Sequence, residues 1–322
     1  MTKITWSLLL ATLLALGLQV ASAHAQWVRT CVSANGNDAN TCHCTQPCRT
    51  FQRAHDQTLA DGEVTVLDPG GYGPLTITKS ISIVNDGVGE ASIQVSGGGT
   101  GIIVNAPNGG GYVNLRGITI QGVGFGGGTG LLFNTGFSLT MTNCVVRNHT
   151  DKGIWLRPTA DSHFLVKNTL VADNGGRAGI FVDTQNAASV AAEFDHVELY
   201  NNTEGLELNS GVGVSNTAIV KATVTDSVAA NNLGTGTLAG GFRVTSVSPF
   251  LPAYLTIIRS VSAFNGVGLI SSGDGAPHLY IGQSTVTRNA TTFQGNNMIS
   301  FGDNYSRGDG DGDPPLTKTS PR

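Results

Sequence analysis

Residues 201–209 read NNTEGLELN, and the same pattern returns along the chain. Residues 174–182 read NGGRAGIFV, and residues 265–271 read NGVGLIS. Each copy starts with asparagine, continues through small residues and a glycine, and ends in alternating apolar residues. A unit that returns in this way predicts stacked copies of one supersecondary element.

The repeat has the period and the inner pattern of a parallel β-helix. Its aligned copies from residue 122 onward end 24 to 33 residues apart, and periods of this size indicate stacked units. One copy contains three alternating runs, at 191–194, 196–200 and 205–209. Three strands and three bends per turn predict an all-β solenoid of roughly eight or nine coils, with neighbouring coils about 4.8 Å apart.

An asparagine at the last position of most copies predicts a hydrogen-bonded ladder in the bends. Asparagine tolerates a left-handed backbone, and its side-chain amide can bond to the same residue one coil away. The glycine that follows lets the chain turn closely into the next strand. Gly122 and His149 interrupt the column. The predicted ladder consists of Asn174, Asn201, Asn232, Asn265 and Asn289.

The N-terminal segment has the pattern of a processing signal. Lys3 precedes the apolar run ITWSLLLATLLALGL, which is too short and too early for a membrane span. Small residues favour cleavage after Ala25, so residues 1–25 are the expected signal peptide; an uncleaved anchor is the alternative. Because no second apolar span follows, we expect no membrane span in the mature chain. We expect export to the periplasm or the extracellular space of a bacterium.

Four of the five cysteines crowd into one segment, CVSANGNDANTCHCTQPC, at residues 31–48. A metal site that includes His43 is one interpretation, but export to an oxidising compartment favours disulfides. Four cysteines allow three pairings. The pairs that we favour are Cys31–Cys44 and Cys42–Cys48. Cys144 lies far away in a strand-like stretch, and we expect it to be a buried free thiol.

After residues 1–25, the chain divides into three further segments. An open solenoid needs its ends covered, because the first and last coils expose unpaired strand edges. The stretch TFQRAHDQTLA, at 50–60, has the spacing of an amphipathic helix of three turns. We therefore assign 26–61 to a disulfide-stapled cap and 62–305 to the β-helix. Residues 306–322 are poor in apolar residues, which predicts a disordered tail.

Composition and spacing exclude several kinds of partner. The net charge is −4, and no cluster of Lys and Arg is present to displace phosphate counterions, so nucleic acid is not expected. Asp309, Asp311 and Asp313 alternate with glycine, but a calcium loop of the helix-loop-helix type needs Glu where Ser320 stands. We therefore expect neither a metal nor a cofactor.

The segment 31–73 carries a family resemblance. It contains a V-S-x-x-G-x-D element, a P-x-x-T-x-x-x-A element and a strand ending in P-G-x-Y. The matching residues are Val32, Ser33, Gly36, Asp38, Pro47, Thr50, Ala54, Pro69, Gly70 and Tyr72. The series resembles the opening of secreted right-handed parallel β-helix proteins of the broad pectate-lyase-like superfamily, and the resemblance covers roughly residues 27–305. It implies right-handed coils and a polysaccharide along one flank, but it is weak for activity because the fold has many functions.

Alternation in the strands after the glycines predicts outward rows with one residue per coil. The first row runs Leu132, Trp155, Phe181, Glu207, Arg243 and Ile270, and the second runs Arg157, Asp183, Asn209 and Thr245. Aromatic faces suit pyranose rings, and guanidinium groups suit uronates. The predicted ligand-binding residues are Trp155, Arg157, Phe181, Asp183, Glu207 and Arg243. The alternative is structural, with Arg157–Asp183 and Glu207–Arg243 as cross-strand ion pairs.

Asp183 and Glu207 are the candidates for catalysis. One coil plus two strand positions separates their Cα atoms by roughly 8 Å, within the carboxyl spacing of inverting glycosidases. An arginine beside each carboxylate would keep it ionised and weaken it as an acid. For a lyase base, His149, His163 and His196 are weaker candidates. The polygalacturonase motifs N-T-D, D-D, G-H-G and R-I-K and the pectate-lyase motif R-x-P-x-x-R are missing.

The sequence therefore predicts an exported protein that binds polysaccharide or has a structural role in the cell envelope, without catalysis. A polysaccharide lyase or glycoside hydrolase acting on an acidic glycan is the first alternative. An adhesin-like interaction protein is the second, and continuous apolar rows on the surface would favour it. The oligomeric state is left open.

Overall fold

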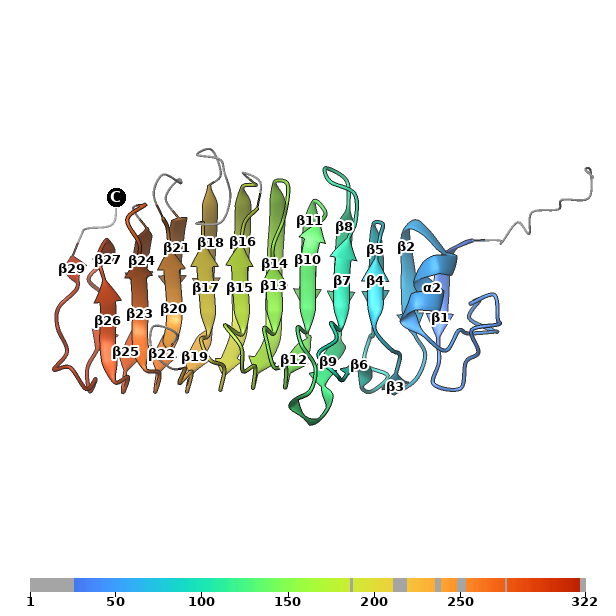
Figure 1. The fold of residues 1–322 in the computed structure, drawn as a ribbon, viewed down its shortest axis with the longest axis horizontal. Helices are drawn as coiled ribbons and strands as arrows, with labels where there is room; N and C mark the ends of the chain where they lie inside the picture. Colours follow the sequence, from blue (N-terminus) through green and yellow to red (C-terminus); the bar gives the residue numbers. More distant parts are fainter. Residues whose placement is uncertain are drawn as a thin grey trace, which may run out of the picture.

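The chain coils into an elongated parallel β-helix, seen from the side in Figure 1. This computed structural model describes residues 26–185, 188–210, 219–234, 239–247, 253–275 and 277–318. The predicted signal peptide, residues 1–25, lies outside the described residues. Neighbouring strands pair in parallel, which confirms the predicted fold class. Within the described residues, no helix is long and apolar enough to cross a bilayer.

Two sheets wind around one core. The nine-stranded sheet consists of β4 (Leu75–Ile77), β7 (Ile102–Asn105), β10 (Leu131–Thr135), β13 (Ile154–Leu156), β15 (Ile180–Asp183), β17 (Leu206–Asn209), β20 (Gly240–Thr245), β23 (Val267–Ser272) and β26 (Thr291–Gly295). The 20-stranded sheet consists of β1 (Trp27–Val32), β2 (Thr58–Val66), β3 (Gly70–Gly71), β5 (Ile81–Val84), β6 (Ala91–Val95), β8 (Tyr112–Arg116), β9 (Ile118–Gly122), β11 (Ser138–Thr142), β12 (Val145–Arg147), β14 (Ser162–Ala172), β16 (Val190–Tyr200), β18 (Val220–Thr225), β19 (Val228–Ala230), β21 (Ala253–Ile258), β22 (Val261–Ala263), β24 (His278–Gly282), β25 (Thr285–Thr287), β27 (Met298–Ser300), β28 (Tyr305–Ser306) and β29 (Thr317–Lys318).

A sharp bend divides the larger sheet into two outer faces. The strands β14 and β16 each pass through one residue with a left-handed backbone, Asn168 (φ 48°) and His196 (φ 53°), so two predicted runs form one bent strand. The wide face consists of β5, β8, β11, residues 162–167, residues 190–195, β18, β21 and β24. The narrow face consists of β9, β12, residues 169–172, residues 197–200, β19, β22 and β25.

In most strands of the 20-stranded sheet, alternation buries every second side chain, whereas every residue of β15 and β17 in the nine-stranded sheet is buried. Phe194 and Val224 are in register on neighbouring coils, and both are buried. Burying one such side chain stabilises the fold by about 1.5–3 kcal/mol. Cys144 joins this core as a free, buried cysteine, and burial raises the pKa of its thiol to about 11. The prediction of an inert buried thiol is confirmed.

A buried asparagine ladder connects successive coils, but the coil of β16 contributes Asn202 rather than the predicted Asn201. The amide of Asn174 donates to Asn202 Oδ1 at 2.8 Å, and the amide of Asn202 donates to Asn232 Oδ1 at 3.2 Å. Asn265 and Asn289 continue the ladder at 2.9 and 3.1 Å. The other four predicted members are therefore confirmed.

The residue before each ladder asparagine adopts the left-handed backbone. Asn201 has φ 54°, is exposed, and donates to Asp173 Oδ1 at 3.1 Å. The ladder side chains must point inward to meet their copies one coil away, so the strained position falls on the residue before them. The expectation of left-handed ladder asparagines was wrong. Two successive asparagines stand in this bend, and the sequence pattern does not distinguish which of them points inward.

His149 begins the ladder that it was predicted to interrupt. Its backbone N–H donates to Asn174 Oδ1 at 3.2 Å. Its Nε2 lies 3.3 Å from the carbonyl oxygen of Ile120, in the place where a ladder asparagine donates its amide to the preceding coil. His149 is buried, and burial lowers its pKa. It therefore acts as a neutral substitute for asparagine, which makes it unsuited to be an exposed lyase base.

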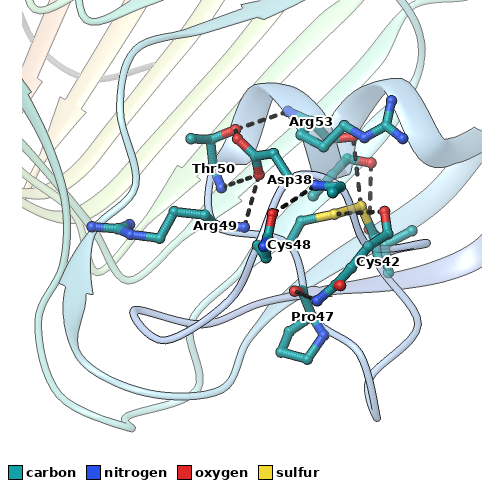
Figure 2. The surroundings of a disulfide bond; sticks show 12 residues. Asp38, Cys42, Pro47, Cys48, Arg49, Thr50 and Arg53 are labelled. Atoms are coloured by element: carbon teal, nitrogen blue, oxygen red, sulfur yellow. Dashed lines mark hydrogen bonds between the residues drawn. A yellow bond between two sulfur atoms is a disulfide. The ribbon is translucent and has the colours of Figure 1, made fainter.

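The N-terminal end is closed by α2 (Phe51–Gln57) and by two disulfides, Cys31–Cys44 and Cys42–Cys48. The favoured pairing is confirmed, and such disulfides are typical of oxidising compartments. The helix is shorter than the predicted 50–60 because the chain enters β2 at Thr58. Figure 2 shows how Asp38 supports the cap: it accepts hydrogen bonds from the backbone N–H groups of Arg49 and Thr50 at 2.8 and 2.9 Å.

The last described residues contact the end of the solenoid. Asp309 Oδ1 accepts hydrogen bonds from both the backbone and the amide of Asn289, at 2.7 and 2.9 Å, and so ends the ladder. The Asp311 carboxylate accepts from the backbone N–H and the hydroxyl of Thr292, in β26. The segment that the sequence analysis assigned to the tail thus carries acceptors for donors that the last coil leaves unpaired. A short 3-10 turn, η1 (Val123–Phe125), lies between β9 and β10.

Candidate functional site

The two rows predicted on the nine-stranded sheet have the expected register. Trp155 lies beside Phe181, Phe181 beside Glu207, and Glu207 beside Arg243. In the second row, Asp183 lies beside Asn209. The repeat therefore placed these side chains on the correct face of the correct coils.

Most of this flank is closed to solvent, contrary to the outward, open rows that were predicted. Phe181, Asp183, Glu207 and Arg243 are 4%, 5%, 1% and 6% exposed. Trp155 and Arg157 are half-buried. A glycan cannot reach the four buried residues without displacing neighbouring atoms. Their role in ligand binding stays a prediction.

The charges on this flank pair differently from the cross-strand pattern. Arg177 donates from Nε and Nη2 to the two oxygens of Glu207, each at 2.6 Å. Arg243 pairs with Glu204, which is fully buried. The predicted Glu207–Arg243 pair was wrong. Each of these residues pairs instead with a residue from a bend, Glu207 with Arg177 and Arg243 with Glu204. The Arg177–Glu207 pair has two parallel hydrogen bonds, which is the strong geometry for arginine and a carboxylate.

Gln185 stands between Arg157 and Asp183, which were predicted to pair. Arg157 Nη2 donates to Gln185 Oε1 at 3.3 Å, and Gln185 Nε2 donates to Asp183 Oδ2 at 3.4 Å. Both hydrogen bonds are long. Asp183 Oδ1 is buried and has no hydrogen-bond partner among the described residues. Burial raises the pKa of Asp183 to about 6, against the opposing effect of Arg157 and Arg177.

Sequence reasoning missed Lys152, Arg177 and Glu204. Lys152 and Glu204 each stand immediately before a glycine that enters a strand, and Glu204 lies inside the quoted stretch NNTEGLELN. Burial raises the pKa of Glu204 above its usual range, although Arg243 lowers it. The sequence signal that was available is a charged residue directly before the glycine that leads into a strand. That glycine marks the position where the bend meets the nine-stranded sheet.

The aromatic rings of this flank are packed between cations. Lys152 Nζ lies 4.0 Å from the centre of the Trp155 ring, and the Arg177 guanidinium lies 4.4 Å from that of Phe181. The two rings stack on each other at 6.4 Å. Because their faces are already occupied, they offer little surface on which a pyranose could stack.

An open groove lies on the wide face instead. It measures about 520 Å³ and is lined by residues of β11, β14, β16 and β18. These four strands are neighbours in the sheet and are labelled in Figure 1. A second hollow of about 280 Å³ adjoins it, and the two share His163 and Ala191. Register places one residue of each coil in a line, which we name the groove row. It consists of Tyr112, Ser138, His163, Ala191, Lys221, Tyr254 and His278.

Aromatic rings lie toward both ends of the groove row, and the small residue Ala191 lies between them. Phe137 lies 5.1 Å from the ring of His163. At the other end, Tyr254 stacks on His278 at 5.0 Å with an angle of 6° between the rings, so one face of Tyr254 is covered. Its other neighbour in the row is Lys221, and Ala191 follows. The row therefore has its smallest side chain, Ala191, at a position that lines both hollows.

Two charged groups in the groove have no ionic partner. Lys221 and Glu193 are exposed, and neither forms an ion pair within the described ranges. They stand one coil and two strand positions apart. On the closed flank Arg177 pairs with Glu207 and Arg243 pairs with Glu204, whereas these two groups remain available to a ligand.

One group of potential metal ligands lies at the bend between the two faces, consisting of Asp195, His196 and Asp226. Asp195 contacts Lys167 at 2.6 Å, and Asp226 contacts Arg259 at 2.7 Å. Because cations already balance both carboxylates, this group does not fit a metal centre.

Comparison with known proteins supports the fold. No family model and no curated protein matches the chain. The solved structure of pectate lyase Pel9A is similar with a TM-score of 0.66 and 16% identity, over 91% of this chain and 77% of the lyase. A mannuronan C-5 epimerase module from Azotobacter vinelandii (TM-score 0.38, 12% identity, 81% and 91% of the two chains) and a rhamnogalacturonan lyase (0.37, 12%, 84% and 72%) are more distant. The chain thus has the pectate-lyase-like parallel β-helix fold.

Proposed function

We propose that this is an exported, non-catalytic polysaccharide-binding protein, and that the glycan lies in the groove of the wide face. The observation that carries the proposal is the groove row, in which Ala191 leaves space between His163 and the unpaired Lys221. A binding site for sugars combines apolar rings with a few polar groups that are free to bond.

The groove row supplies Tyr254 and His278 as rings and Lys221 as a cation without an ion pair in the described part of the chain, with its Nζ 5.8 Å from the centre of the Tyr254 ring. On the closed flank, cations lie closer to the rings, at 4.0 Å from Trp155 and 4.4 Å from Phe181.

The polysaccharide-acting names of the structural neighbours are compatible with binding of a glycan in the groove. The alternative of a lyase or hydrolase would use Asp183 and Glu207. Both carboxylates are buried, and Glu207 is held by two hydrogen bonds from Arg177. Catalysis there would require the flank to open before a substrate could bind.

A glycan array probed with the chain from Gln26 onward tests the proposal. Ala191→Trp should fill the groove and abolish binding, and Lys221→Ala should weaken it at least tenfold. Ser82→Trp, on the same face but at the β5 coil, is the matched control and should bind normally. The pair Trp155→Ala and Phe181→Ala tests the closed flank.

Binding lost only in the Trp155 and Phe181 variants would move the ligand to the closed flank and contradict the groove. Any glycan that binds is then incubated with the protein and assayed for new reducing ends. Cleavage that disappears in Asp183→Asn would overturn the non-catalytic part of the proposal.

A further inference from the structure

The sequence contains four asparagines that directly precede a glycine, and they are Asn35, Asn108, Asn174 and Asn265. In such a pair the backbone nitrogen of the glycine can attack the side-chain Cγ of the asparagine. Glycine favours this attack because it has no Cβ beside its nitrogen and because its backbone turns freely. Whether a pair reacts in the folded chain therefore depends on how firmly the fold holds the asparagine side chain and the glycine N–H.

The pairs at Asn174 and Asn265 are held in the asparagine ladder. The two asparagines are 0% and 1% exposed, and both donate their amides to the next coil. The N–H groups of Gly175 and Gly266 donate to carbonyl oxygens of the preceding coil, at 2.8 and 3.3 Å. Attack at either pair would break these hydrogen bonds, so the fold protects both.

The pair at Asn35 is exposed, but its glycine is fixed in place. The N–H of Gly36 donates to the carbonyl oxygen of Ser33 at 2.9 Å. A Cβ on Gly36 would lie 2.2 Å from the carbonyl oxygen of Cys48, so this glycine packs directly against the disulfide-stapled cap. The Gly36 nitrogen is therefore not free to move toward the side chain of Asn35.

The pair at Asn108 has none of these restraints. Asn108 and Gly109 are both exposed. Neither the side chain of Asn108 nor the N–H of Gly109 forms a hydrogen bond with any residue that the structure describes. Gly109 has φ 74°, and a Cβ on it would meet no atom within 4 Å. Both reacting groups are therefore open to water and free to approach each other.

The loop that carries this pair is fixed at its base and free at its tip. Ser80 Oγ donates to the carbonyl oxygen of Gly110 at 2.8 Å. On the other side, the N–H of Phe137 donates to the carbonyl oxygen of Gly111 at 2.9 Å. These contacts join the loop to the coils on both sides, so a chemical change at its tip leaves the coils in place.

We propose that Asn108, alone among the four asparagines, deamidates spontaneously in the folded chain. The bond from Gly109 N to Asn108 Cγ forms, the bond from Cγ to the amide nitrogen breaks, and the Gly109 proton leaves with that nitrogen as ammonia. Water then opens the succinimide to aspartate or isoaspartate. The product carries one more negative charge, in the loop between β7 and β8 that leads into Tyr112 of the groove row. This inference does not depend on the proposed glycan binding.

Peptide mass spectrometry after incubation at mildly alkaline pH tests the proposal, using the chain from Gln26 onward with its disulfides intact. A parallel sample, unfolded in urea with its disulfides reduced, gives the rate of each pair without protection. In the folded chain, we expect Asn108 to convert within about threefold of its unfolded rate, and the other three asparagines at least tenfold more slowly than theirs. Protection of Asn108 equal to that of Asn174 would overturn the proposal, and so would conversion of Asn35 as fast as that of Asn108.

Isoelectric focusing of two matched variants gives a second measurement. Asn108→Gln should suppress the acidic form at least tenfold, because attack on a glutamine side chain must close a larger ring that forms more slowly. Asn35→Gln is the control and should accumulate the acidic form at the rate of the original protein. An acidic form that persists in Asn108→Gln would place the reaction at another residue and contradict the assignment.

Discussion

The closed flank and the wide face are built by the same rule, with one residue per coil in a parallel register, yet their charges behave differently. On the closed flank, the half-buried Arg177 pairs with the buried Glu207, and Arg243 and Glu204 form a pair in which both side chains are buried. On the wide face, Lys221 and Glu193 are exposed and form no ion pair with any residue that the structure describes. Burial therefore determines whether a charged row stabilises the fold or stays free for a ligand, since an unpaired charge is costly only where water is absent.

Breaking a buried ion pair should have the largest effect. Arg243→Met leaves Glu204 buried without its cation, and we expect a loss of about 3–5 kcal/mol in the free energy of unfolding. Urea unfolding followed by circular dichroism measures it. Arg259→Met, which breaks the pair between the exposed Arg259 and the half-buried Asp226, is the matched control and should change stability far less. Equal losses in the two variants would contradict the comparison.

The ladder offers the same contrast between two neighbouring asparagines. Asn232→Ala removes a buried amide and leaves its partners Asn202 and Asn265 each without one hydrogen bond. We therefore expect the free energy of unfolding to fall by about 2–3 kcal/mol. Asn231→Ala removes an exposed side chain and should cost less than about 1 kcal/mol. Thermal or urea unfolding distinguishes the two variants. A larger loss of stability in Asn231→Ala than in Asn232→Ala would contradict the assignment of the ladder to Asn232.

Asp183 should make stability depend on pH. Its pKa is raised to about 6 in the folded chain, so the folded state binds the proton more tightly than the unfolded state does. Its stabilising contribution is complete below the unfolded pKa, near 4, and is lost as pH rises through about 6. The free energy of unfolding of Asp183→Asn should thus exceed that of the original protein by about 1–2 kcal/mol at pH 8, and the two values should be equal at pH 3.5. A gain that is equal at both pH values would show that desolvation of this carboxylate is not the cause.

The smallest effect on stability is expected in the groove. Lys221→Ala should change the free energy of unfolding by less than about 0.5 kcal/mol, because the side chain is exposed and unpaired. Its effect should fall on glycan binding instead. A clear loss of stability would mean that Lys221 supports the fold, which would weaken its assignment to the ligand.

Several features were predictable because they depend on local pattern and period. The asparagine and glycine spacing predicted the coils and the register of Trp155 with Phe181, and the crowded cysteines favoured the correct pairs. Alternation did not distinguish Asn201 from Asn202, since both belong to one bend and either could point inward. The partners of Glu207 and Arg243 come from bends, where no strand period applies, and were missed for that reason.

The sequence by itself determined the solenoid, the cap and the order of residues along each face, because strand alternation and bend chemistry act over a few residues. Only the tertiary structure decided which face is closed and which is open. The exposure of a row depends on the bends and side chains of other coils that pack across it. A local sequence pattern does not indicate which of these residues cover the row. For this reason Glu207, predicted on an open flank, is buried, while Ala191, which no motif marked, lies at the centre of the groove.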